Sequence, residues 1–355
     1  MDRYIGLDVH ATSTTLAVLG PSGRRLKTAV IETNGKALIE ALKAIPEPRH
    51  VCFEEGTQAE WLFQILKPHA AEVVVAKVEN SRGQKSDAKD AFGLAELLRT
   101  GKLGTRVFKD VGAFATLRDL SRLYSMLRDD VVRTKNRIKS LYRSRGVATP
   151  DGDVYAVKHR TKWLKTLTPG KRLAAEKLYD ELDKQSELKD AAEDALVEES
   201  HRHPIARILE TCPGFGPIRA AQMMAIVVAP HRFRTKRQLW AYCGLGIVTR
   251  SSSDWVPGPK KGDWLRAPVQ VTRGLNLNHN HLAKAILKGA ATTVITKRTS
   301  ELADAYQRLL MNGTKPNLAK LTIARRIAAI LLAVWKTGEE YDPKKHRKQK
   351  LSLAS

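Results

Sequence analysis

Cysteine is scarce in this chain, with three residues in 355. Cys52, Cys212 and Cys243 are widely spaced and form no CxxC pair, which argues against a disulfide framework and against a zinc site. Long apolar runs are also missing, so no segment is predicted to span a membrane. The first residues, MDRYIGLDVH, lack the basic and apolar regions of a signal peptide. We therefore expect a cytoplasmic protein with buried, reduced thiols.

Acidic residues are few relative to basic ones. The chain has 37 Asp and Glu against 61 Lys and Arg, a formal net charge of +24. This balance indicates a polyanionic partner, most often nucleic acid, although charge alone does not separate DNA, RNA and an anionic membrane. The length and the hydrophobic content of 43% allow two or three domains with real cores.

Short β-branched runs alternate with helical patterns in the first hundred residues. Strands are predicted at 4–9, 14–19, 28–32, 50–54 and 72–78, and helices at 35–45, at 59–67 and from about Asp87. The order βββαβαβα is that of the RNase H-like fold, a mixed sheet flanked by helices. The first region is therefore predicted to be an α/β domain.

Four acids occupy suggestive places in this order. Asp87 and Asp90 lie one turn apart at the start of a helix, where the simplest explanation is a capping box. Asp8, however, lies inside the first predicted strand, where an unpaired carboxylate is costly unless a metal or a partner compensates it. Glu54 ends the fourth strand, and ligand sites in such sheets lie at strand ends. Together the four acids favour a magnesium-binding cluster over capping.

A heptad pattern begins near Phe114 and runs for four heptads. The first seam consists of Leu117, Tyr124, Val131 and Ile138, and the second of Leu120, Leu127, Thr134 and Leu141. A second helix is predicted from about Lys171 to Glu199, so residues 111–203 should form a helical hairpin or a dimerising arm. Its charges would ordinarily be a solvated face, but their sign favours a surface that follows phosphates. The strongest candidates are Arg133, Lys135, Arg137 and Lys139.

The region after Pro204 contains two further candidate sites. Gly214 and Gly216 separate two helical segments and resemble a helix-hairpin-helix element, whose amides can hold a phosphate; an ordinary tight turn explains the pair equally well. The second is a loop rich in Gly and Pro that carries three consecutive serines, a pattern that is usually plain linker. Its serines, Ser251, Ser252 and Ser253, could expose a hydroxyl near a bound phosphate. The candidate phosphate contacts of the loop are Arg250, Lys260 and Lys261. Two more helices and a basic tail complete the chain.

Five stretches in this order resemble one known family. They are GLDVH, FEEGTQAEWL, KSDAKDAFGLAELLR, CPGFGPIRAA and YCGLGIVTRSSSDW. Separately they are weak motifs, but their order and spacing are similar to those of the DEDD-type insertion-sequence transposases, the "one-ten" family. The resemblance covers nearly the whole chain.

The resemblance implies an N-terminal RuvC-like domain in which Asp8, Glu54, Asp87 and Asp90 bind magnesium (Mg2+). It also implies a nucleophilic serine in the C-terminal domain. Many members have a glycine after that serine, and RSSSDW does not; counting from Gly244 favours Ser252 and leaves Ser251 and Ser253 open. Many members read Glu-Ala-Thr-Gly where this chain reads EEGT, so Glu55 is a lesser alternative to Glu54.

The family implies a serine recombinase guided by a noncoding bridge RNA that pairs with donor and target DNA, and an assembly of dimers that pair into a tetramer. We then expect a RuvC-like DEDD domain (1–110), a coiled-coil arm (111–203), a mostly helical transposase domain with the serine loop (204–300) and a helical extension with a basic tail (301–355). Its serine and its metal would form a composite site. The rival expectations are a magnesium-dependent RuvC-like nuclease and a non-enzymatic nucleic-acid-binding protein.

Overall fold

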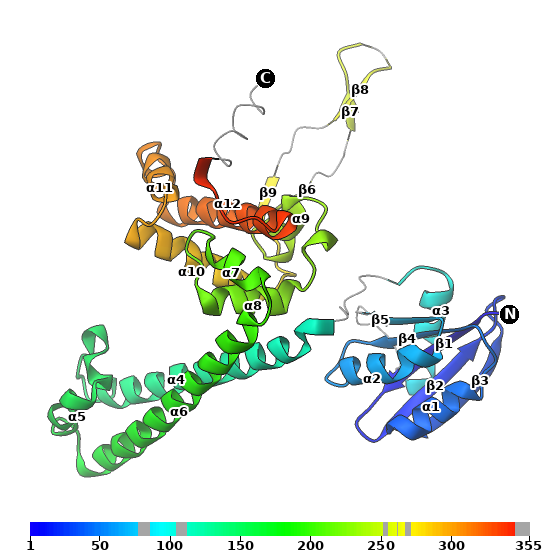
Figure 1. Cartoon of the computed structure of the whole chain (residues 1–355), viewed down its shortest axis with the longest axis horizontal. Helices are drawn as coiled ribbons and strands as arrows, with labels where there is room; N and C mark the ends of the chain where they lie inside the picture. The colour runs from blue at the N-terminus through cyan, green and yellow to red at the C-terminus, as the bar shows by residue number, and fades with distance from the viewer. Residues whose placement is uncertain (77–85, 104–111, 251–254, 261, 267–270, 345–355) are drawn as a thin grey trace. The chain divides into compact units, whose positions relative to one another are not determined.

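The computed structural model describes residues 1–76, 86–103, 112–250, 255–260, 262–266 and 271–344 (Figure 1). The chain divides into two compact units, Met1–Asp110 and Val111–Ser355. Among the described residues, no helix has both the length and the apolar character required to cross a membrane. All three cysteines are buried.

The first unit is built on a five-stranded mixed sheet with the order β3-β2-β1-β4-β5. Its strands are β1 (Arg3–Val9), β2 (Ser13–Leu19), β3 (Arg25–Glu32), β4 (Arg49–Glu54) and β5 (Glu72–Ala76). Strands β1, β4 and β5 run parallel, whereas β2 is antiparallel to both β1 and β3. This arrangement is compatible with the RNase H-like fold that the order of elements predicts.

Helices cover both faces of this sheet. They are α1 (Gly35–Lys43), α2 (Ala59–Leu66) and α3 (Asp87–Arg99). Ile5 and Leu7 of β1 pack into one core with residues of α1 and α2, while α3 packs against the opposite face over Cys52 and Val74. Because side chains alternate along a strand, Gly6 and Asp8 of β1 belong to the face that α3 covers.

Two long helices form an arm in the second unit: α4 (Ala115–Arg143) and α6 (Pro169–His201) pack lengthwise against each other (Figure 1). All four residues of the first heptad seam are buried, and so is Thr134 of the second. At the tip, α5 (Val157–Leu164) and a 3-10 helix at Pro150–Tyr155 join the two helices. There the hydroxyls of Tyr142 and Tyr179 lie 3.0 Å apart, and Tyr179 also donates to the carbonyl of Val154 at 2.9 Å.

Shorter helices pack into a second core after the arm. They are α7 (Ile205–Glu210), α8 (Pro217–Val227), α9 (Lys236–Tyr242), α10 (His281–Lys297), α11 (Leu302–Met311) and α12 (Pro316–Thr337). Alanines on α8, α10 and α12 are buried throughout this core, which lets the helices approach closely. Helix α10 was not among the elements predicted from sequence.

Two small antiparallel ribbons interrupt this helical region where the sequence predicts only a loop. One pairs β6 (Ile247–Arg250) with β9 (Val271–Leu275), and the other pairs β7 (Trp255–Pro257) with β8 (Trp264–Arg266). The mainly helical character expected for this part of the chain is otherwise present, since most of its described residues are helical.

Candidate functional site

The start of helix α3 lies beside the end of strand β1 because Gly6 leaves no side chain between them. A Cβ atom at Gly6 would lie 1.9 Å from the carbonyl oxygen of Ala91 and 2.8 Å from the amide nitrogen of Ala95. Both alanines are fully buried. This close approach brings Asp87, the first residue of α3, next to Asp8, which lies two residues after Gly6 on the same face of the sheet.

Capping does not account for the acids at this helix start. The N-cap residue is Ser86, whose hydroxyl accepts a hydrogen bond from the backbone amide of Lys89 at 3.4 Å. Asp87 and Asp90 are helical residues of the first turn, where their negative charge suits the helix dipole. Their carboxylates therefore remain available for a ligand.

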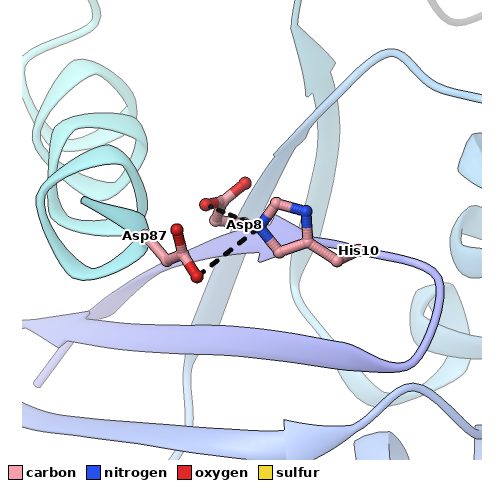
Figure 2. Close-up of side chains that lie close together, drawn as sticks. All are labelled: Asp8, His10 and Asp87. Atoms are coloured by element: carbon pink, nitrogen blue, oxygen red, sulfur yellow. Dashed lines mark ion pairs between the residues drawn. The ribbon is translucent and has the colours of Figure 1, made fainter. Parts of the chain in front are cut away.

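Asp8, His10 and Asp87 converge at one point (Figure 2). The Nε2 atom of His10 lies 3.5 Å from a carboxylate oxygen of Asp8 and 3.6 Å from one of Asp87. One ligand atom from each of the three residues lies within 4.8 Å of the others. The Asp8 side chain is 24% exposed, while those of His10 and Asp87 are 51% and 61% exposed, so the cluster is open to solvent on one side.

The surroundings of Asp8 oppose its ionisation. Burial raises the pKa of the Asp8 carboxyl above its ordinary value of 3.8, and the negative charges of Asp87 and Asp90 raise it further, while His10 acts in the opposite direction. A divalent cation at this point would relieve the mutual repulsion of the carboxylates.

Glu54 and Asp90 are nearby but do not belong to this compact group. Glu54 is exposed at the end of β4, one position beyond the pairing of Leu7 with Phe53, and is therefore level with Asp8 on the neighbouring parallel strand. Equivalent positions of parallel strands face the same side of a sheet. Asp90 lies one helical turn beyond Asp87 and is close enough to influence the pKa of Asp8.

Sequence reasoning missed His10 and the packing role of Gly6. A signal for His10 was present, because it follows Asp8 by two residues at the strand end and so lies on the same side of the chain. Glu55, the alternative to Glu54, is exposed and donates its backbone amide to the carbonyl of Ala76 at 3.0 Å.

The glycine pair before α8 has two different environments. Gly214 adopts a φ of 74°, and a Cβ there would lie 2.4 Å from the carbonyl oxygen of Ala290 on α10, so this residue is needed for helix packing. Gly216 is the N-cap of α8 and borders a hollow of about 360 Å³. Arg128 and Arg219 also line this hollow. Gly216 leaves free space beside the hollow, but both cations are engaged within the protein. Arg128 pairs with Asp129 at 2.8 Å, and Arg219 donates to the carbonyl of Gly214 at 2.5 Å and to the hydroxyl of Thr293 at 3.0 Å.

The predicted phosphate contacts on the arm are partly engaged within the protein. Arg133 forms an ion pair with Asp130, and Arg137 lies 3.5 Å from Glu181. Lys135 and Lys139 instead lie over the ring of Tyr155, at 5.3 and 5.7 Å from its centre.

The serine loop lies partly within the described residues. Arg250 ends strand β6, and Lys260 is exposed between β7 and β8. Ser251, Ser252, Ser253 and Lys261 lie outside the described residues. Their roles therefore remain predictions.

A five-stranded mixed sheet with carboxylates gathered at one end of β1, followed by a basic helical region, is compatible with an enzyme that acts on nucleic acid. Comparison with known families narrows this class. A sequence model of the DEDD transposases of IS110 elements matches residues 5–144, and one described as the transposase IS116/IS110/IS902 family matches residues 206–264. The chain belongs to this family of insertion-sequence transposases.

Two curated proteins illustrate the similarity. The transposase for insertion sequence element IS1533 of Leptospira borgpetersenii is 30% identical over 174 residues, which are 46% of this chain and 50% of that protein. The y4qE protein of Sinorhizobium fredii, also named as a transposase, is 21% identical over 361 residues, covering 94% of this chain and 88% of that protein. The match therefore spans half the length of the first relative and most of the second.

Proposed function

We propose that this protein cuts and rejoins donor and target DNA through a covalent serine–DNA link, guided by an element-encoded noncoding bridge RNA. The observation that carries the proposal is the convergence of Asp8 and Asp87 at the end of β1 in a chain of this family. A protein that only binds nucleic acid gains nothing from carboxylates brought together against their own repulsion.

The donor set fits magnesium. Carboxylate oxygens are the ligands that Mg²⁺ prefers. Asp8 and Asp87 converge, and Glu54 at the end of β4 and Asp90 one turn further along α3 would complete the set. An imidazole nitrogen suits transition metals better, so His10 is assigned to orienting the two carboxylates that it contacts. When bound, Mg²⁺ supplies Lewis-acid stabilisation of charge on the scissile phosphate.

A serine hydroxyl supplies the nucleophile in this proposal. Ser252 is the first choice, with Ser251 and Ser253 as alternatives. The serine hydroxyl loses its proton as its oxygen bonds to phosphorus, the phosphorus–oxygen bond to a deoxyribose breaks, and the departing deoxyribose oxygen takes up a proton to become a free hydroxyl. One phosphate ester replaces another, so the reverse reaction can rejoin a new strand without an external energy source.

Phosphate contacts from the second unit hold the nucleic acid during this exchange. The hollow beside Gly216, which Arg128 and Arg219 also line, takes one phosphate group in this proposal. Lys260, Lys261, Arg250 and the basic residues of the arm add contacts that do not depend on sequence. Base pairing by the RNA would then read the sequence, and dimers that pair into a tetramer would bring the two DNA molecules together.

The deciding experiment traps the covalent link. Purified protein is mixed with the noncoding RNA of its own element, magnesium and end-labelled donor and target DNA, and the products are separated on a denaturing gel. We expect a protein-linked DNA band that is absent in Ser252→Ala and in Asp8→Asn.

Matched variants identify the nucleophile. If the band persists in Ser252→Ala but disappears in Ser251→Ala or Ser253→Ala, a neighbouring serine is the nucleophile. Cleavage without any linked species in all three serine variants and in the unmutated protein would overturn the proposal in favour of a hydrolytic nuclease. Loss of cleavage on removal of the RNA is expected; full activity without RNA would contradict guidance.

A further inference from the structure

The ribbon formed by β7 and β8 exposes two tryptophans. Trp255 is 57% exposed and Trp264 is 63% exposed. By contrast, Trp335 of the helical core is only 8% exposed. Large exposed aromatic side chains indicate a surface that contacts a partner, because their burial releases much free energy. Neither residue has a role in the proposed chemistry.

The strand register places both tryptophans on one face. Trp255 pairs with Arg266, and Pro257 pairs with Trp264. Positions 255 and 257 share a face, so Trp255 and Trp264 are diagonal neighbours on it. Such neighbours lie about 7–8 Å apart. At this backbone spacing, both indole side chains can reach bases of one bound strand.

Charge identifies the kind of partner. The ribbon and its connection, residues 255–266, contain Lys260, Lys261 and Arg266 against the single acid Asp263. Lys260 is exposed. Aromatic rings next to cations are the combination that binds single-stranded nucleic acid, with stacking on the bases and attraction to the backbone. An apolar protein surface would not require the basic residues.

We propose that Trp255 and Trp264 form a stacking platform for unpaired bases of a single-stranded nucleic acid. Opened DNA strands and RNA loops share this chemistry. The inference rests on the proposed function only in that the ligand is nucleic acid. Trp255 follows Ser252 by three residues in the sequence, so the platform belongs to the same segment of chain as the nucleophile.

The test measures the affinity of the full-length protein for short labelled oligonucleotides by fluorescence anisotropy. The probes are a 12-nucleotide thymidine strand, a 12-nucleotide uridine strand and a 12-base-pair duplex. Trp255→Ala and Trp264→Ala should each weaken binding to a single strand by about tenfold, whereas duplex binding should stay within twofold. Trp255→Phe should recover most of the loss, because a phenyl ring still stacks.

Leu265→Ala is the matched control. Leu265 is 54% exposed on the same ribbon but on its opposite face, so its removal should leave single-strand affinity unchanged. Unchanged melting temperatures of all variants would show that the fold is intact. A preference for the thymidine over the uridine strand would indicate opened DNA, and the reverse preference an RNA loop.

The inference is overturned if the tryptophan variants bind single strands as tightly as the unmutated protein, or if Leu265→Ala weakens binding equally. Equal losses for single strands and duplex would overturn it as well, because stacking requires unpaired bases. The covalent-trapping experiment is independent of these outcomes. A protein that forms no serine link but loses single-strand affinity with its tryptophans would refute the proposed function and keep this inference.

Discussion

Asp8 combines the features of a metal ligand in a single residue. It lies within a strand of the central sheet, its side chain is 24% exposed, and the charges of Asp87 and Asp90 act on it. Burial raises its pKa, and so do these two neighbours. Without a metal, folding disfavours the ionised form of this carboxyl. A bound cation would stabilise the ionised form and so favour its own binding.

Replacing Asp8 should separate the cost of its ionisation in the folded protein from its contribution to cation binding. Because folding raises the pKa of Asp8, its contribution to stability is fully present below the ordinary value of 3.8 and is lost as pH rises through the folded pKa. In metal-free buffer at pH 7, Asp8→Asn should raise the melting temperature, because it removes a negative charge that burial and the neighbouring carboxylates disfavour in the folded state. Thermal unfolding followed by circular dichroism checks this.

Magnesium should reverse the order of the melting temperatures of the unmutated protein and Asp8→Asn. Millimolar Mg²⁺ should raise the melting temperature of the unmutated protein and leave Asp8→Asn unchanged, because a cation stabilises only the state that binds it. Glu54→Gln should reduce the magnesium response, and Glu55→Gln should not. An equal response in Asp8→Asn and the unmutated protein would place the cation elsewhere.

At the scale of elements, the site depends on how closely α3 approaches β1. The contact has no room for a side chain at Gly6, where a Cβ would meet the backbone of Ala91 at 1.9 Å. Backbone atoms cannot rotate away as a flexible side chain can, so any larger residue must move the whole helix. Displacement of α3 would carry Asp87 and Asp90 away from Asp8.

Gly6→Ala tests this coupling of packing to the site. We expect a loss of about 2 kcal/mol or more in unfolding free energy, measured by urea titration, together with a weaker magnesium response. Gly93→Ala is the control, because Gly93 lies in α3 itself with nothing within 4 Å of its Cβ position. That change should be neutral or stabilising by up to about 1 kcal/mol. Equal stability of Gly6→Ala and Gly93→Ala would contradict the tight contact.

Elements with a local signal could be predicted from the sequence, and those that depend on tertiary contacts could not. The short apolar, β-branched strands around Asp8 and the heptads of α4 follow from local sequence patterns alone. The ribbons were missed because their strands are three to five residues long, too short to show a period. The proximity of His10 to Asp87 was missed because it depends on how α3 docks, which no local pattern encodes.

At the scale of the whole molecule, the charge is very unevenly distributed. Residues 1–110 carry a net charge of only +2, whereas residues 111–355 carry +22. The acidic cluster of Asp8 therefore belongs to a nearly neutral unit, and attraction of nucleic acid falls to the other unit. This division explains how carboxylates and a polyanionic substrate can be combined in one chain, since long-range attraction and local chemistry are assigned to different units.

Non-specific binding to duplex DNA should therefore depend on salt through the second unit. Each lysine that contacts a phosphate contributes about 0.9 to the slope of log affinity against log salt concentration. Replacing both Lys135 and Lys139 by Gln should reduce this slope by about 2, because neither pairs with an acid among the described residues and both lie beside Tyr155 on the arm. Lys36→Gln, an exposed position of α1 in the nearly neutral unit, should leave it unchanged. Titrations between 50 and 300 mM salt measure the slope, and an equal reduction in the Lys36 variant would show that the arm has no special share in binding.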